Sequence, residues 1–413
     1  MESEKIILKN GLTIYLLCDK TKHTTLANLI VNFGGIDDKY FYNNKKLHIK
    51  SGTAHFLEHV VLESSKYGDL MKILSNNGIR CNGLTTIERT EFYIDTVDDF
   101  YDNLKLLISG IHSPIFDKEK IDDIRKPILE EKRRSLDNKY SNLYNANVQT
   151  YLNNNKFKSI LGDMSDIKNI NTIDLERCFK AFYRPSNEIL IITGNFDKTS
   201  ILSVVEETYK SLKIETNNFE RIIPALKDKV NKKKVIVKDN TNIGRTIITF
   251  KININSLTGI EKINLDIYIY SFLRMNFGIT SKLNKKLIND NIIVGNLVFL
   301  TSAINGYYIV KIEANTDNSE EFIRNILDYI NNKKYIFDED LFNLYKKGYI
   351  IDLIVRNDSI YSILEPFIQN IMFLNYEKLD TVKDLENINF KEYKEKINNL
   401  VFSNFSITEL RKK

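Results

Sequence analysis

Two histidines four residues apart, His55 and His59, enclose a glutamate in the segment His-Phe-Leu-Glu-His. On a helix, residues four apart lie one above the other, and Glu58, three residues after His55, joins the same face. Neutral imidazole nitrogens suit Zn²⁺, and a catalytic zinc site has three protein ligands with a water in the fourth position. The segment therefore predicts that His55 and His59 bind zinc, while Glu58 remains free to take a proton from that water.

A structural helix with two partly buried histidines would show the same letters. The chain holds only five histidines, and this spacing with this glutamate is a catalytic signature with a stated mechanism rather than a loose pattern. We therefore favour the metal site over the structural helix.

The third zinc ligand must come from another part of the chain. The best candidates are the adjacent Glu130 and Glu131, inside a predicted helix at residues 118–136. Isoleucines at helical spacing, the last of them Ile128, mark the inner face of this helix, and Glu131 continues that face. Periodicity thus predicts Glu131 as the ligand. Pro127 removes a hydrogen bond and can shift the register, which leaves Glu130 as the alternative.

The motif helix must be buried for its histidines to face a cavity. Ser51 or Thr53 can cap its first turn. The apolar residues that surround the motif are Phe56, Leu57, Val60, Val61 and Leu62.

Strands and helices alternate on both sides of this motif. In the first half, runs of β-favouring residues predict strands at 6–17 (a hairpin), 26–33, 80–87, 91–97 and 188–193, with a polar loop at 39–50. Helical periodicity predicts helices there at 68–75, 100–109, 118–136, 140–152, 174–182 and 197–212.

The second half partly repeats this order, from a strand at 235–238 to a final strand at 400–407. Between the halves, a polar stretch predicts a linker at 215–234. We therefore expect an α+β protein with two similar domains, a metal-binding catalytic domain at 1–214 and a metal-free one at 235–413.

Composition narrows the partners and the compartment. The 413 residues are 43% hydrophobic and 27% charged, which is typical of a folded globular protein. The net charge of +5 comes from 59 basic and 54 acidic residues that are interspersed, so we expect no nucleic-acid partner. No apolar run is long enough to span a bilayer. Acidic residues occupy the place where a signal peptide would be basic and apolar, which predicts a cytoplasmic protein.

The three cysteines, Cys18, Cys81 and Cys178, are far apart and odd in number. They do not form a disulfide framework, and buried apolar packing is the simplest role for each.

Several segments together resemble one peptidase family. They are the His-Phe-Leu-Glu-His motif, the Glu130-Glu131 pair, the Asn-Gly-Leu-Thr segment at 82–85 and the Tyr-Arg-Pro-Ser-Asn segment at 183–187. With them the chain resembles the pitrilysin and insulinase family of inverted-motif zinc peptidases (M16), especially its short bacterial members related to processing peptidases.

The resemblance implies a fold, an activity and a binding surface. Each domain would be a mainly antiparallel sheet with helices on one face, and the chain would form half of a clamshell around a closed chamber. The activity would be zinc-dependent endopeptidase cleavage of peptides or unfolded segments. The strand containing Asn82, Gly83, Leu84 and Thr85 would bind the peptide substrate as an added strand.

The chain departs from the family at positions that matter for catalysis. Ile124 stands where family members commonly carry another glutamate, and Ile288 and Gly295 stand where many carry an arginine and a tyrosine that hold the substrate. Neither Ile288 nor Gly295 can donate a side-chain hydrogen bond to a developing oxyanion. We therefore expect a heterodimer with a related, metal-free subunit. A homodimer remains open, because Arg274 or Lys282 could substitute.

A second function is compatible with the same residues. The missing glutamate and clamp residues favour a peptide-binding or scaffold subunit that does not cleave, whereas the intact Glu58 favours an enzyme.

Overall fold

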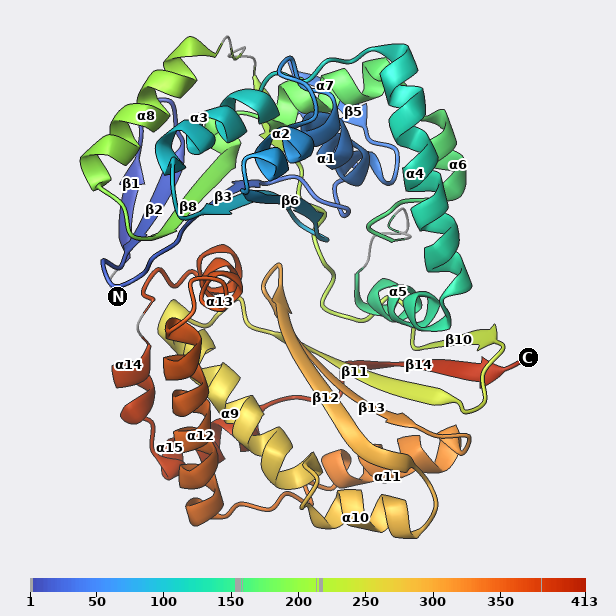
Figure 1. Cartoon of the computed structure of the whole chain (residues 1–413). Helices are drawn as coiled ribbons and strands as arrows, with labels where there is room; N and C mark the ends of the chain where they lie inside the picture. The colour runs from blue at the N-terminus through green and yellow to red at the C-terminus, as the bar shows by residue number, and fades with distance from the viewer. Residues whose placement is uncertain (1–2, 153–156, 158, 213, 215–217, 380) are drawn as a thin grey trace. The chain divides into compact units, whose positions relative to one another are not determined.

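The chain folds into two units, each built of strands and helices (Figure 1). The structure is a computed structural model, which describes residues 3–152, 157, 159–212, 214, 218–379 and 381–413. The first unit consists of Met1–Asp137 and Asn154–Pro224, and the second of Asn138–Asn153 and Ala225–Lys413. Each unit combines a β-sheet with α-helices, so the α+β prediction is confirmed.

A six-stranded sheet forms the base of the first unit. Strand β2 pairs in parallel with β8, and the other neighbours are antiparallel. The order across the sheet is β1 (Glu4–Ile7), β2 (Thr13–Cys18), β8 (Glu188–Gly194), β3 (Thr25–Val31), β7 (Thr90–Thr96) and β6 (Arg80–Thr85).

Helices cover one face of this sheet and bury its apolar side chains (Figure 1). Leu29, Ile94 and Ile192 from the strands meet Phe56 and Leu104 from the helices in one core. The helices are α1 (Thr53–Glu63), α2 (Leu70–Asn76), α3 (Phe100–Ile111), α4 (Lys118–Asp137), α6 (Met164–Asn169), α7 (Thr172–Phe182) and α8 (Lys198–Ser211), with a 3₁₀ turn at Pro185–Asn187.

The polar loop predicted at 39–50 is wrong. It contains β4 (Lys39–Tyr42) and β5 (Lys45–His48), which pair with each other. β4 also pairs with β9 (Phe219–Arg221), a strand inside the predicted linker at 215–234, of which 215–217 lie outside the described residues. These strands lack the apolar pattern that predicts a strand. The small sheet buries Tyr40 but leaves most other side chains partly or fully exposed, so polar residues are tolerated there.

The second unit repeats the plan with a five-stranded sheet. The order is β10 (Lys234–Asp239), β14 (Phe405–Lys412), β11 (Arg245–Asn253), β13 (Tyr307–Asn315) and β12 (Val294–Ile304). Its helices are α9 (Gly259–Phe277), α10 (Lys282–Asn289), α11 (Ser319–Asn331), α12 (Glu339–Asn357), α13 (Leu364–Gln369), α14 (Val382–Glu386) and α15 (Phe390–Asn399), with a π-helix at Asn370–Leu374. The final strand, predicted at 400–407, begins five residues later, at Phe405.

Helix α5 (Lys139–Tyr151) belongs to the second unit, and not to the predicted domain at 1–214. Its Asn147 side chain donates to the hydroxyls of Thr249 on β11 (2.7 Å) and Thr408 on β14 (3.1 Å). Thr150 pairs with Ser406 at 2.6 Å. Local periodicity identifies the helix but not the sheet that it covers.

No helix among the described residues is long and apolar enough to cross a membrane.

A buried ion pair fixes the loop that follows β3. The Arg221 guanidinium donates to both carboxylate oxygens of Asp37 at 2.8 Å and to the Glu88 carbonyl at 2.8 Å. Glu88 is itself buried, and its Oε1 has no hydrogen-bond partner among the described residues. Burial raises the pKa of the Glu88 carboxyl to about 8, against the opposing influence of Arg221 and Arg89.

This shift predicts a pH-dependent stability. Because the folded-state pKa of Glu88 is raised, its contribution is complete below the unfolded-state pKa of 4.5 and is lost as pH rises through about 8. The loss is at most about 1.4 kcal/mol per pH unit. Glu88→Gln should therefore melt at a higher temperature than the wild type at pH 8.5, with little difference near pH 4.5. Thermal unfolding at both pH values measures this.

The exposed Glu206→Gln variant is the control and should follow the wild type at both values. Equal melting of Glu88→Gln and wild type at pH 8.5 would contradict the shift.

Candidate metal centre

Helix α1 begins at a glycine in a left-handed conformation. Gly52 has φ +85°, and a Cβ there would lie 2.5 Å from the Leu161 carbonyl oxygen. The predicted cap by Ser51 or Thr53 is wrong. Ser51 instead donates its backbone N–H and its hydroxyl to Asp166, and the Thr53 hydroxyl donates to a backbone carbonyl three residues earlier. These bonds fix the start of α1 against α6.

Burial of α1 is nearly complete along its length, as the apolar residues around the motif predict. His55 and Glu58 are 6% and 8% exposed. The rings of His55 and His59 are stacked edge to face along the helix, with centroids 4.8 Å apart. The helix therefore presents two imidazoles in one direction.

Helix α4 brings Glu131 to these imidazoles. The helix is continuous through Pro127, so the register does not slip. The Glu131 Oε2 atom lies 3.4 Å from His55 Nε2 and 4.0 Å from His59 Nε2. The three residues whose convergence the sequence predicts are thus together in the structure.

The alternatives to Glu131 point into solvent. Glu130 is exposed and forms an ion pair with Arg133 on the same helix. Asp123, the acid closest to the missing family glutamate, pairs with Lys126 in solvent, and Ile124 is packed in the core.

The three donors fit a zinc ion. Their ligand atoms lie within 4.8 Å of one another, and they are the only such group of three among the residues that the structure describes. Bonds of about 2.0–2.1 Å in a tetrahedron place donors about 3.3 Å apart, close to the 3.4 Å between His55 and Glu131. Burial and the neighbouring His59 lower the pKa of His55 to about 3, which keeps its ring neutral, as a ligand must be.

A second carboxylate orients His59. Glu63 lies one turn later on α1, and its Oε1 is 2.8 Å from His59 Nδ1. Burial alone would lower the pKa of His59, but the bond to Glu63 and the charges of Glu58, Glu63 and Glu131 raise it. Carboxylates behind metal-binding histidines fix the ring and strengthen metal binding 10- to 100-fold. Glu63 is not among the residues predicted from the sequence, although its spacing of four residues from His59 is a signal for this contact.

Glu58 points from the same helix toward strand β6 rather than toward α4. Its Oε2 accepts a hydrogen bond from the Thr85 hydroxyl, and its side chain lies against Gly83. Burial raises the pKa of Glu58, while the Thr85 bond and His59 oppose the rise. A carboxylate with a raised pKa beside a metal site is suited to accept and return a proton.

The segment predicted to bind substrate divides into two faces. Asn82 and Leu84 are exposed, whereas Gly83 and Thr85 turn toward α1. β6 is the last strand in the sheet order, so its outer edge is available for pairing within the described part of this unit.

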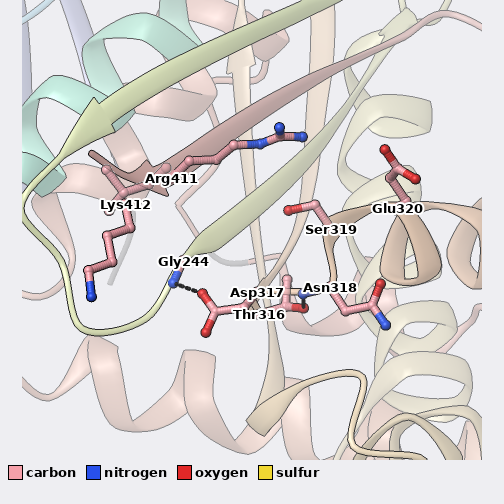
Figure 2. Close-up of a pocket in the computed structure, with 9 residues that line it drawn as sticks. Gly244, Thr316, Asp317, Asn318, Ser319, Glu320, Arg411 and Lys412 are labelled. Atoms are coloured by element: carbon pink, nitrogen blue, oxygen red, sulfur yellow. Dashed lines mark hydrogen bonds between the residues drawn. The ribbon is translucent and has the colours of Figure 1, made fainter.

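The second unit contains a polar pocket of about 320 Å³ between β11, β14 and the start of α11 (Figure 2). Asp317 accepts a hydrogen bond from the Gly244 backbone at 2.7 Å, and Arg411 is paired with Glu409. All five histidines of the chain precede residue 113, so this pocket has no imidazole. The chemistry that the sequence predicts is confined to the first unit.

Comparisons with known proteins agree with this two-domain α+β fold. The family model described as "Insulinase (Peptidase family M16)" matches residues 15–163, and that described as "Peptidase M16 inactive domain" matches residues 169–349. The chain belongs to peptidase family M16.

Individual relatives cover different shares of the chain. An uncharacterized zinc protease of Bacillus subtilis, YmfH, is 24% identical over 93% of this chain and 90% of its own length. The mitochondrial-processing peptidase subunit beta of Bos taurus is 26% identical over 50% of this chain and 41% of its own length. The M16-like peptidase of Alicyclobacillus acidocaldarius shares the fold, with a TM-score of 0.86, 19% identity and coverage of 100% of this chain and 98% of its own.

The geometry predicts which glutamate holds the metal. Glu131→Gln should abolish stoichiometric zinc binding, because it removes the only carboxylate within reach of both imidazoles in the described structure. Glu130→Gln should retain full zinc, because its carboxylate pairs with Arg133 in solvent. Zinc content after dialysis, measured by atomic absorption, distinguishes them. Zinc loss in Glu130→Gln with retention in Glu131→Gln would assign the opposite register.

Proposed function

We propose that this chain is a zinc-dependent endopeptidase that cleaves peptides or unfolded segments. The observation that carries the proposal is the arrangement around α1, where His55 and His59 meet Glu131 on one side while Glu58 stands apart on the other. A protein that used the metal only for stability would have no need of a buried carboxylate beside it.

In this mechanism His55, His59 and Glu131 would hold the zinc ion, which would supply an acidified water and a Lewis acid for the scissile carbonyl. Glu58 accepts the proton of the nucleophilic water at Oε1, the carboxylate oxygen that Thr85 does not bind. The same oxygen then returns the proton to the leaving amine. Glu63 keeps the His59 ring in position throughout.

The edge of β6 suits an extended peptide. Its backbone N–H and C=O groups can pair with those of a substrate strand. Asn82 and Leu84, which are exposed, would contact substrate side chains. Main-chain pairing tolerates many sequences, which favours peptides and unfolded segments over folded domains.

We further propose that the enzyme is a heterodimer with a related, metal-free subunit, which together form a closed chamber. Two observations support this: Ile288 and Gly295 offer no polar side chain where a substrate clamp is expected, and one relative is named as a subunit of a processing peptidase. A homodimer is the alternative, with Arg274 or Lys282 as the clamp. Both side chains are exposed.

A non-cleaving peptide-binding or scaffold subunit is the second candidate function. Ile124 in the core, in place of a glutamate, and the match to a domain described as inactive favour it. The buried, hydrogen-bonded Glu58 favours the enzyme.

Substitution of Glu58 should abolish cleavage without affecting zinc binding. Glu58→Gln keeps the shape of the side chain but cannot accept a proton, so we expect full zinc content and a loss of cleavage of at least about 100-fold. Cleavage of a mixed peptide pool, followed by mass spectrometry, measures the loss. Zinc-loaded wild type that cleaves nothing, alone or with a related subunit, would favour the binding subunit instead.

The subunit composition is tested by adding the expected partner. We expect the chain alone to cleave slowly, and a related metal-free subunit that supplies an oxyanion donor to raise kcat by about 100-fold. Gel filtration before and after mixing, with activity in each fraction, measures both assembly and rate. Full turnover by a dimer of this chain alone would contradict the heterodimer.

A further inference from the structure

The inner face of β6 holds the Glu58 side chain in one orientation. The Thr85 hydroxyl donates to Oε2 of Glu58. Thr85 is buried, and its hydroxyl lies 3.4 Å from that of Thr90, which in turn donates to the Phe33 carbonyl at 2.8 Å. The hydroxyl that binds Glu58 is therefore itself fixed by strand packing rather than free to rotate into solvent.

The Glu58 side chain also lies close against Gly83 on the inner face of β6. A Cβ on Gly83 would lie 2.7 Å from Oε1 and 2.8 Å from Cγ of Glu58, and 2.9 Å from a methyl group of Leu62. The Glu58 side chain thus occupies the space that any other residue at position 83 would fill. Two residues of one strand, spaced by two, together define where the carboxylate lies.

We propose that Thr85 is a positioning residue for the proton-accepting Glu58. By anchoring Oε2, the hydroxyl leaves Oε1 to take the proton from water and return it to the leaving amine, while Thr85 keeps its own proton. This inference rests on the proposed function, because a fixed orientation of Glu58 affects the rate only if Glu58 is the base. Proton transfer requires such a group within hydrogen-bond reach of the reacting atoms.

The geometry also couples two functions to one strand. The outer edge of β6 is proposed to pair with the peptide backbone, and its inner face holds the base. The position of the base relative to the bound peptide therefore depends on the Thr85 hydrogen bond and on the packing of α1 against β6.

The hydroxyl of Thr85 is the group to remove. Thr85→Val replaces it with a methyl group of similar size, and Thr85→Ser retains it. We expect Thr85→Val to lose about 10- to 100-fold in kcat with unchanged KM and zinc content, since hydrogen bonds to charged groups have this magnitude. Thr85→Ser should remain near the wild type. If valine prevents folding, Thr85→Ala carries the same expectation.

Thr25→Val is the matched control. Thr25 is a buried threonine on β3 of the same sheet, and its hydroxyl donates to the Asn195 carbonyl at 2.7 Å. It pairs with Thr96, at the end of β7 opposite to Thr90. Thr25→Val should lower the melting temperature without lowering kcat, which separates loss of a buried hydrogen bond from loss of positioning.

A measurement that does not require turnover tests the role of Thr85 independently of the proposed function. Cobalt(II) substituted for zinc gives a visible spectrum that depends on its coordination geometry and its immediate neighbours. Thr85→Val should change this spectrum as Glu58→Gln does, and Thr85→Ser should not. If the wild type cleaves no peptide, the proposed function fails, and the cobalt spectra still decide the role of Thr85.

Two results would overturn the inference. One is a Thr85→Val variant with wild-type kcat and a wild-type cobalt spectrum. The other is a Thr85→Ser variant that loses as much as Thr85→Val, since the loss would then come from packing rather than from the hydroxyl.

Discussion

The burial of one short helix between two different neighbours is the constraint on which the candidate site depends. Helix α1 packs against α4 on one side and against β6 on another, with Phe56, Leu57 and Val60 fully buried in the core. A helix held on several sides cannot rotate, so residues one turn apart keep fixed directions. His55 and His59 therefore meet α4 while Glu58 meets β6, so the side chains proposed for metal binding and for proton transfer have different neighbours.

The sequence predicts the parts of this arrangement that depend on periodicity. The spacing of the motif and the isoleucines of α4 place Glu131 opposite the histidines, and α4 keeps its register through Pro127 because it remains one continuous helix. Contacts between elements are harder to foresee. The bond from Thr85 to Glu58 joins a strand to a helix 27 residues earlier, and no periodic pattern in either element specifies it. The contact of Glu63 with His59 was predictable, because residues four apart are neighbours on a helix.

The two units share one architecture, a sheet covered by helices, but differ in the residues that the helices carry. In each, strands that are distant in sequence are neighbours in the sheet, and helices bury an apolar face. In the second unit, helix α10 buries Leu283, Asn284 and Leu287. Asn284 there bonds to Asn296 and to the Leu297 backbone, so its amide links α10 to β12. An amide that joins a helix to a sheet stabilises the fold but offers no group for hydrolysis.

The membership of α5 in the second unit affects how the chain can be divided. The polypeptide leaves the first unit after Asp137, contributes this helix to the other sheet, and returns at Asn154. A fragment cut at the linker would strip the second sheet of the helix whose Leu143 covers Ile247 and Leu410. The fragment that keeps α5 would carry an amphipathic segment with nothing to pack on. The halves of this protein are thus not separable by a single cut in the gene, and a truncated first half should be prone to aggregate.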